Sequence, residues 1–533
     1  MERISYPRTP HLPWSPGVSR DDVRVADLGA WAGGEVVVTE KLDGENTTLY
    51  RDGSHARSLD SGHHPSRSWV KALQGRVGGF IPVGWRVCGE NLYARHSLAY
   101  QELDGYFYGF SVWDGDECLD WDSTVGFLRG LGIPVPTVLW RGVFDEKMLR
   151  RLKVDTLVSE GYVVRPAAGF GLGDFGRTVA KWVRPAHVRT STHWMSAPVV
   201  PNGLGPGARY WDIRSGAGFE LPDGDQAAAE KVADELRPGE GRLVGVLAAA
   251  YHRRPRGRVV LDLVDRVGMG TARRVGDVVG LHRLLHHDFP EDQRRSGLLR
   301  FATAVDLGVL HAVAGAVATG GARDQVAWSA LHAEDLPRWP EFAGSARRLA
   351  EARDLVIRDG RAFGPEEADA ATWRWRDRDC PEFFHLVGIS GSGKSTFAAK
   401  SDVDEVVSMD DLRADAGDRA DQRSNARVLG VALDRLGAAL RHGRSALWDA
   451  TSITARQRDA VQAVARRHDA TRTYVVVLAS EAEIRRRNAN RADPVPDHVL
   501  SAQIRRFDPP YAWQAHRIRY VDATGTVVAD AHQ

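Results

Sequence analysis

Lys41, which is followed by Leu42, Asp43 and Gly44, is placed where its amine could act as a nucleophile. The apolar run from Val36 to Val38 precedes it, so we expect the lysine where a strand turns at Asp-Gly. A lysine amine attacks phosphorus only after losing its proton, which requires nearby cations or metal ions that lower its pKa. The same pattern is also typical of an ordinary Asp-Gly hairpin with a solvated lysine.

A second candidate for phosphate chemistry is the complete P-loop Gly388-Ile389-Ser390-Gly391-Ser392-Gly393-Lys394-Ser395-Thr396. Phe383 to Val387 predict a buried strand before it, and helical residues follow, which is the context that a P-loop requires. Its glycines let backbone N–H groups face phosphates, Lys394 reaches the β- and γ-oxygens, and Ser395 is placed to ligate magnesium. The predicted nucleotide-binding residues are Gly388, Gly391, Ser392, Gly393, Ser395 and Thr396.

Acidic residues beyond the P-loop suit a phosphoryl acceptor site. The segments 408–413 and 448–451 resemble the strand-end segments of polynucleotide 5′-kinases. The resemblance implies that Asp410 is the general base that takes a proton from a 5′-hydroxyl. It also implies that Arg413 grips the acceptor's phosphate and that Asp449 binds substrate. An ordinary helix N-cap is the alternative for the acidic pair that begins at Asp410.

Four arginines lie close together further along the chain, at Arg485, Arg486, Arg487 and Arg491. Residues 487–491 resemble the lid of these kinases. Because Arg487 and Arg491 are four residues apart, they share one helix face, and the resemblance implies that both act on the γ-phosphate during catalysis. A solvated basic helix is the alternative.

Residues 39–46, 55–58, 87–93, 107–114, 159–165 and 179–184 form a series of segments in a fixed order. They resemble the RNA ligase branch of the covalent nucleotidyltransferase superfamily, and the resemblance covers nearly all of residues 6–200. It implies that Lys41 is the catalytic nucleophile toward ATP. Arg57 would contact the ribose and phosphate, Glu90 a ribose hydroxyl, and Phe110 the purine face. The expected ligands of Mg²⁺ or Mn²⁺ are Glu160, Asp43 and, in the P-loop, Ser395.

The closing lysine segment, Val179-Ala180-Lys181-Trp182-Val183-Arg184, departs from the commonest Lys-x-Lys form of that family. Lys181 is expected to neutralise the α-phosphate. Val183 occupies the second lysine position and Arg184 follows it, so the identity of the second basic group stays open. Residues 6–13 and 187–194 resemble the segments that bracket bacterial RNA ligases, but chemistry assigns neither a role.

Length and composition suggest about three domains in one chain of 533 residues. The net charge of +1 provides no global field for nucleic acid or membrane, so a polyanion site must be a local cluster. Three cysteines without Cys-x-x-Cys spacing fit a reducing compartment. The N-terminus lacks the apolar core of a signal peptide, and Leu243–Tyr251 is too short to span a bilayer, so we expect a cytoplasmic protein with no membrane partner.

We expect an α+β and α/β multidomain chain: an antiparallel-sheet, ATP-grasp-like ligase domain over residues 1–200, an all-α domain over 201–379 and a P-loop α/β kinase domain over 380–533. The apolar residues of 243–251 recur with helical spacing. In the middle segment, His282, His286, His287 and Asp288 could hold a metal as in HD-type phosphohydrolases. Their position at a helix end before Pro290 favours an interaction with the helix dipole instead.

Together the motifs predict an enzyme that phosphorylates an RNA 5′-hydroxyl and then joins the 5′-phosphate to a 3′-hydroxyl through lysyl-AMP and RNA-adenylate. RNA with 5′-OH and 3′-OH ends, with tRNA as one candidate, is the expected partner. A separate 3′-end phosphatase or phosphodiesterase is expected where the 3′ end is blocked. The alternatives are a DNA ligase or capping-type nucleotidyltransferase fused to a kinase, and a non-catalytic sensor of RNA ends.

Overall fold

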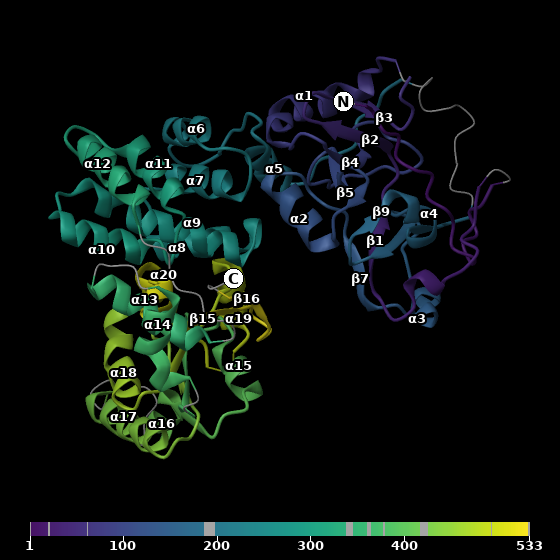
Figure 1. The fold of residues 1–533 in the computed structure, drawn as a ribbon. Coiled ribbons are helices and arrows are strands. Elements are labelled where there is room, and N and C mark those ends of the chain that lie inside the picture. The colour runs from purple at the N-terminus through teal and green to yellow at the C-terminus, as the bar shows by residue number, and fades with distance from the viewer. Residues whose placement is uncertain are drawn as a thin grey trace. The chain divides into compact units, whose positions relative to one another are not determined.

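The computed structural model describes residues 2–19, 22–60, 62–185, 198–336, 345–359, 364–376, 379–415, 425–491 and 493–530. The chain divides into two compact units, shown as ribbons in Figure 1. Unit 1 comprises Met1–Glu220 and Arg237–Leu243, and unit 2 comprises Leu221–Leu236 and Val244–Gln533. Within the described ranges, no helix combines the length and the apolar character needed to cross a membrane. The segment 187–194 lies outside the described residues.

Unit 1 is built on two antiparallel sheets, which confirms the predicted antiparallel fold. The four-stranded sheet has the order β10 (Ala180–Val183), β8 (Gly161–Pro166), β1 (Glu35–Lys41) and β7 (Val138–Val143). The six-stranded sheet has the order β3 (Gly53–Ala56), β2 (Glu45–Tyr50), β4 (Trp85–Asn91), β5 (Phe107–Asp114), β6 (Glu117–Cys118) and β9 (Phe170–Gly171).

The turn after Lys41 carries the chain from one sheet to the other, because β1 belongs to the four-stranded sheet and β2 to the six-stranded one. The hairpin alternative is therefore wrong for this Asp-Gly. A Cβ atom on Gly44 would lie 2.5 Å from the carbonyl oxygen of Asn91, so the crossing backbone leaves room only for glycine. Lys41 ends β1 at the boundary of the two sheets.

Separate apolar cores fix the two sheets. Helices α1 (Ser68–Val77) and α2 (Trp121–Gly130) pack on the six-stranded sheet through Val70, Leu73 and Leu128, among others. Helix α3 (Glu146–Arg151) contributes Leu149 to the core of the four-stranded sheet. The short helix α4 (Phe175–Thr178) and helix α5 (Ala208–Ser215) complete unit 1. These cores hold the adjacent ends of β1, β4, β5, β8 and β10 in place.

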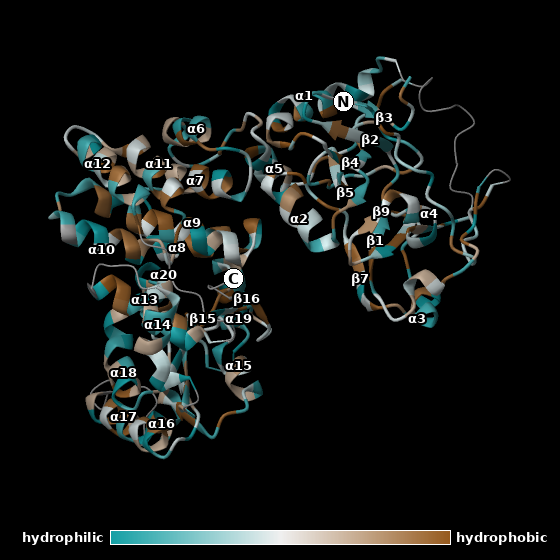
Figure 2. Ribbon diagram, viewed as in Figure 1, coloured by the Kyte–Doolittle hydropathy of each residue, from teal (hydrophilic) through white to brown (hydrophobic). Residues whose placement is uncertain are grey.

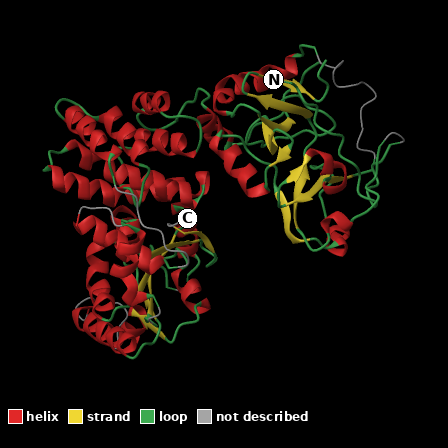
Figure 3. Cartoon of the chain, in the orientation of Figure 1, coloured by secondary structure: helices red, strands yellow, loops and turns green. Residues whose placement is uncertain are grey.

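The first part of unit 2 is helical, as predicted. In Figure 3 its helices are red, and the strands that precede and follow it in the sequence are yellow. Its helices are α6 (Gln226–Glu235), α7 (Glu240–Ala250, which begins in unit 1), α8 (Arg256–Val267), α9 (Met269–Leu281), α10 (Glu291–Phe301), α11 (Leu307–Val317), α12 (Ala322–Glu334), α13 (Ala346–Asp359) and α14 (Pro365–Thr372). The predicted stripe Leu243, Val246, Leu247, Ala250 and Tyr251 is buried. Brown and teal residues alternate along these helices in Figure 2, as expected for amphipathic helices.

The P-loop part of unit 2 is a sheet whose first five strands are parallel. The order is β12 (Glu405–Ser408), β13 (Ala446–Asp449), β11 (Glu382–Val387), β14 (Thr471–Val477), β15 (Arg517–Val521) and the antiparallel β16 (Val527–Asp530). The helices of this part are α15 (Lys394–Lys400), α16 (Met409–Asp415), α17 (Asn425–Arg441), α18 (Ala455–Arg467), α19 (Glu481–Ala489) and α20 (Asp497–Arg506). This is the predicted alternation of strands and helices.

The helical and P-loop parts of unit 2 pack tightly against each other. The domain boundary between residues 379 and 380 stays a prediction. Arg256 of α8 is buried, with its guanidinium 2.5 Å from Asp277, 3.2 Å from Asp508 and over the ring of Tyr511. A Cβ atom on Gly257 would lie 1.8 Å from the carbonyl oxygen of Phe507, which is backbone and has little room to move. Helix α8 therefore packs directly against the segment that follows α20.

We expect Gly257→Ala to destabilise unit 2 by about 1–3 kcal/mol, because the added methyl overpacks this contact. Gly297 in α10 is the matched control, since nothing lies within 4 Å of the position of its Cβ. Gly297→Ala should stabilise by about 0.5–1 kcal/mol through helix propensity. Peptide-resolved hydrogen exchange should show faster exchange around residues 497–511 in the Gly257 variant alone. Equal exchange in both variants would contradict a tight contact.

Candidate functional site

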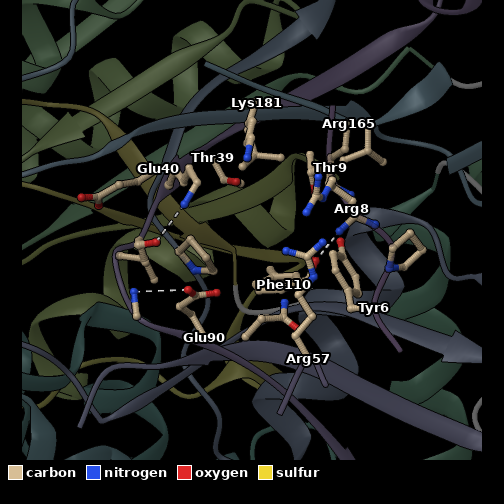
Figure 4. A pocket seen from close by; sticks show the side chains of 18 of the residues that line it. Tyr6, Arg8, Thr9, Thr39, Glu40, Arg57, Glu90, Phe110, Arg165 and Lys181 are labelled. Atoms are coloured by element: carbon tan, nitrogen blue, oxygen red, sulfur yellow. Dashed lines mark hydrogen bonds between the residues drawn. The ribbon is translucent and has the colours of Figure 1, made fainter. Parts of the chain in front are cut away.

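Unit 1 contains a pocket of about 580 Å³ at the boundary of its two sheets (Figure 4). It brings together five residues predicted from the sequence, each delivered by a different strand or loop: Lys41, Arg57, Glu90, Phe110 and Lys181. They are spread over residues 41–181 of the sequence, so the two-sheet fold is what gathers them. The pocket contains cations, carboxylates and an aromatic side chain, which suits a ligand with phosphate, hydroxyl and ring groups.

Lys41 pairs with Glu160, and Nζ lies 2.5 Å from Oε2. The register of β1 and β8 places Lys41 opposite Gly161, so Glu160 arrives beside the lysine from the start of β8. Burial by itself lowers the pKa of Lys41, but the carboxylates of Glu160, Glu90 and Asp43 outweigh it and hold that pKa above its ordinary value. In this arrangement the amine is protonated, so it becomes a nucleophile only when the charge on Glu160 is engaged elsewhere.

Glu90 lies at the end of β4, and its Oε1 accepts a hydrogen bond from the Gly44 N–H at 3.2 Å. Burial raises the pKa of Glu90 to about 7, Lys41 opposes the shift, and Glu160 adds to it. The carboxylate thus contacts the same Asp-Gly turn that follows Lys41. A group with this pKa can accept or donate a hydrogen bond near neutral pH.

Lys181 in β10 is the second lysine of the pocket. Burial lowers its pKa, and the positive charges of Lys41 and Arg57 lower it further, against Asp22 and Glu160. An anion bound near Lys181 would compensate this concentration of positive charge, and phosphate groups are anions that Lys and Arg bind well.

Three other predicted residues, Asp43, Glu160 and Arg184, are not part of the pocket lining, although Glu160 pairs with Lys41, which is. Asp43 is engaged with the backbone, because its Oδ2 accepts from the Leu98 N–H at 2.8 Å. Arg184 is buried, and its guanidinium donates to the carbonyl oxygen of Thr156 at 3.1 Å. Within the described part of unit 1, Lys181 rather than Arg184 is the basic group of the closing segment that reaches the pocket.

Other residues line the pocket that were not predicted as site residues, among them Tyr6, Arg8, Thr9, Asp22, Asn46 and Arg165. The resemblance of residues 6–13 to a bracketing segment was the signal for the first three, but it carried no chemical role. Tyr6 packs edge-on against Phe110 with ring centroids 5.3 Å apart. Arg165 donates to the Phe110 carbonyl oxygen and fixes the backbone of β5 behind that ring.

No three His, Cys, Asp or Glu side chains among the described residues are grouped so that they could hold a metal ion on their own. This includes the His282 region, where the His282 ring faces the His252 carbonyl oxygen at 3.3 Å and burial lowers its pKa to about 4. Glu160 still suits a hard cation, because magnesium is commonly held by one or two carboxylates together with substrate phosphates. The donors therefore fit a cation that arrives with a nucleotide.

The P-loop of unit 2 has the backbone conformation its glycines predict. Gly391 and Gly393 have φ of +86° and +114°, and a Cβ on Gly388 would lie 2.6 Å from the Ser392 hydroxyl. The Lys394 ammonium donates to the Ile389 carbonyl oxygen at 3.1 Å across the loop. Burial lowers the pKa of Lys394 to about 8, opposed by Asp449 and Asp410. Ser395 and Thr396 are exposed at the start of α15.

The acceptor residues lie at the carboxyl ends of neighbouring strands. Asp449 ends β13 and pairs in register with Ser408, the last residue of β12, and Asp410 follows at the start of α16. Asp410 is exposed and accepts from Arg413 at 2.7 Å. The charges of both aspartates raise the pKa of Lys394 against the effect of burial, and the charge of Arg491 lowers it.

The two predicted lid arginines have different surroundings. Arg487 is held by Glu483 at 2.5 Å and by the carbonyl oxygen of Ala523 at 2.6 Å. That same carbonyl lies beside Gly393 of the P-loop, so Arg487 is close to the loop, with its Nε and Nη1 donating to Glu483 and Ala523. Arg491 lies just beyond α19 and is exposed. Their joint contact with a γ-phosphate stays a prediction.

Family models match two segments of the chain. Residues 34–183 match the family model described as RNA ligase. Residues 383–510 match the model described as AAA domain. A search of curated proteins found no match.

Solved structures resemble parts of the chain. A chain of the Pnkp1/Rnl/Hen1 complex is 21% identical with a TM-score of 0.21, over 23% of this chain and 43% of that one. A Naegleria gruberi RNA ligase mutant with ATP and Mn is 16% identical with a TM-score of 0.23, over 30% and 52%. An apo mutant of the Naegleria gruberi enzyme is 15% identical with a TM-score of 0.24, over 34% and 60%. The chain thus covers about half the length of these structures.

The two family matches fall on the two sites described above, one on the Lys41 pocket and one on the P-loop. The chain is therefore similar to RNA ligases over residues 34–183 and to AAA domains over residues 383–510, the segment that carries the P-loop.

Proposed function

We propose that unit 1 is an ATP-dependent RNA ligase in which Lys41 is the nucleophile. The observation that carries this proposal is the gathering of Lys41, Arg57, Glu90, Phe110 and Lys181 around one pocket, within residues matched by the RNA ligase model. The match favours RNA over the DNA ligase and capping alternatives. The retained lysine and its charged neighbours favour an enzyme over a non-catalytic sensor.

In the first step, Lys41 Nζ attacks the α-phosphorus of the substrate ATP, a P–N bond forms, and pyrophosphate leaves. Lys181 neutralises charge on the α-phosphate, Phe110 supports the purine, and Glu90 holds a ribose hydroxyl. A divalent cation bound at Glu160 would neutralise phosphate charge and remove the counterion that keeps Lys41 protonated. Arg184 and Asp43, which lie outside the pocket lining, would act indirectly, through the position of the strand ends.

In the later steps, an RNA 5′-phosphate oxygen takes AMP from Lys41, and a 3′-hydroxyl oxygen then attacks the 5′-phosphorus and releases AMP. The strand that supplies the 3′-hydroxyl must be unphosphorylated there. We therefore propose that a blocked 3′ end is repaired by a separate phosphatase or phosphodiesterase before sealing. RNA with a 5′-OH and a 3′-OH, such as a cleaved tRNA, is the substrate class that fits both steps.

We further propose that the P-loop domain phosphorylates RNA 5′-hydroxyl ends and so supplies the ligase with its substrate. Asp410 would accept the hydroxyl proton, Arg413 would hold the RNA phosphate, and Asp449 would orient the acceptor. Lys394 and the P-loop amides would hold the phosphates of ATP, with Ser395 as a magnesium ligand.

Free cysteines at Cys88, Cys118 and Cys380 support a cytoplasmic location for both reactions.

Lys41→Ala is expected to abolish formation of lysyl-AMP, because it removes the amine that the end of β1 places in the pocket. The measurement is covalent labelling of the full chain by α-labelled ATP. The same preparation should still phosphorylate 5′-OH RNA, which serves as the folding control. Label at the wild-type level in the variant would contradict the nucleophile assignment.

Asp410→Asn is expected to lower the rate of 5′-phosphorylation by about 100- to 10,000-fold, because the general base is lost while the side-chain shape is kept. ATP binding to unit 2 should persist, and so should lysyl-AMP formation at Lys41. Lys394→Ala should instead weaken ATP binding at the P-loop. Unchanged phosphorylation by the Asp410 variant would refute its role as the base.

An RNA-end assay tests both sites together. Wild type should seal 5′-OH, 3′-OH RNA, whereas a 3′-phosphate version should be phosphorylated but not sealed. Lys394→Ala should seal only RNA that already carries a 5′-phosphate, and Lys41→Ala should stop at phosphorylated RNA. Sealing of the 3′-phosphate RNA by wild type alone would overturn the proposed need for a separate 3′-end enzyme.

Glu90 should make unit 1 less stable as the pH rises from 4.5 to about 7. Its pKa is raised from 4.5 to about 7 in the folded chain, so the unfolded chain releases the proton first and is favoured across that window. Glu90→Gln removes this contribution and should flatten the dependence. The measurement is the unfolding midpoint of unit 1 against pH in both proteins; parallel profiles would contradict the assignment.

A further inference from the structure

The N-terminal segment forms one wall of the unit 1 pocket, although it precedes the residues matched by the RNA ligase model. Tyr6, Pro7, Arg8 and Thr9 all line the cavity. In the view of Figure 4, Arg8 and Arg57 lie on one side of the pocket, and Glu40 and Glu90 lie on the other. The basic side of the pocket therefore contains Arg57, which belongs to the ligase motifs, and Arg8, which does not.

Hydrogen bonds anchor this segment beside the closing lysine. The Lys181 N–H donates to the Pro10 carbonyl oxygen at 2.9 Å, and the Leu12 N–H donates to the Lys181 carbonyl oxygen at 2.8 Å. His11, which pairs with Lys181 as a parallel bridge, is buried, and its Nδ1 lies 2.9 Å from the Ser15 hydroxyl. The backbone that leads to Arg8 is therefore fixed two residues further along the chain, at Pro10.

The preceding residues fix the segment at its other end. The Tyr6 ring packs edge-on against Phe110 at 5.3 Å and against Phe175 at 5.2 Å. Two residues of extended chain span about 7 Å. In the chain, Arg8 therefore lies midway between Tyr6, which contacts Phe110, and Pro10, which bonds to the backbone of Lys181.

We propose that Arg8 and Arg57 together form a phosphate-binding site on the basic side of this pocket. Guanidinium groups bind phosphate through paired N–H donors and keep their charge at any physiological pH. Arg57 already lowers the pKa of Lys181, so the cations on this side repel one another until an anion arrives. The phosphate comes either from the β- and γ-groups of ATP or from the 5′ end of RNA.

The proposal rests on the proposed ligase function of the same pocket, and the full-length chain tests the two separately. Absence of lysyl-AMP in wild type would defeat the ligase proposal itself. With wild type active, two reactions are compared in Arg8→Ala. The first is lysyl-AMP formation across a range of ATP concentrations, and the second is transfer of AMP from preformed lysyl-AMP to 5′-phosphate RNA.

Loss of a charged hydrogen bond to phosphate is expected to slow one of these reactions by about 10- to 100-fold. A raised KM for ATP in the first reaction assigns the site to the triphosphate. A raised KM for RNA with unchanged adenylation assigns it to the RNA 5′-phosphate. Arg8→Lys should recover part of the loss, because it keeps the charge but not the paired donors.

Arg3→Ala is the matched control from the same segment. Arg3 stacks on Tyr50 and pairs with Asp52 at 3.1 Å, outside the pocket lining. It should weaken the anchoring of the N-terminus without a selective change in either KM. Wild-type kinetics in Arg8→Ala, or equal losses in the Arg8 and Arg3 variants accompanied by a lower melting temperature, would overturn the proposal.

Discussion

The ion pair between Lys41 and Glu160 is the interaction on which the chemistry of unit 1 depends. It joins the last residue of β1 to the residue that precedes β8. Its geometry relies on Gly161, whose φ is +157° and whose Cβ would lie 1.9 Å from the Trp182 carbonyl oxygen. The close approach of β10 thus explains why glycine follows the glutamate. Substitution there would displace the counterion of the nucleophile together with the strand that carries Lys181.

A comparable constraint governs unit 2, where the P-loop is supported from several elements. The Ser390 N–H donates to Gln503 of α20 at 2.9 Å, and the Gly388 N–H donates to the Thr451 carbonyl oxygen at 3.0 Å. Helix α20 in turn is followed by Phe507, on which α8 rests. The helical part therefore contributes to the support of the P-loop.

Much of both sites could be predicted from the sequence, because their signals are local. The P-loop needs only consecutive residues between a strand and a helix, and both appear as expected. Lys41, Glu90 and Lys181 each stand at a strand end with a short recognisable context. Antiparallel strands and the buried stripe of α7 follow from residue periodicity in the same way.

The rest could not be predicted because it depends on packing between distant segments. The Asp-Gly turn looked like a possible hairpin, but whether its two strands pair with each other or enter different sheets is a tertiary choice. The burial of Arg184 against Thr156 is likewise invisible in a spacing pattern. Residues 6–9 reach the pocket only because residues 10–12 bond to β10, and no local motif records that pairing.

These contacts explain how the pocket can hold a reactive amine at rest. A lysine buried among cations alone would lose its proton and stay reactive toward any electrophile that enters. Here the negative charges of Glu160 and Glu90 outweigh the effect of burial and keep the pKa of Lys41 high. The pKa of Lys181 is lowered by burial and by the positive charge of Lys41. The pKa values of the two lysines therefore shift in opposite directions because of their neighbours, not their residue type. Activation of Lys41 requires a change of charge at Glu160, and so the nucleophile depends on what the pocket has bound.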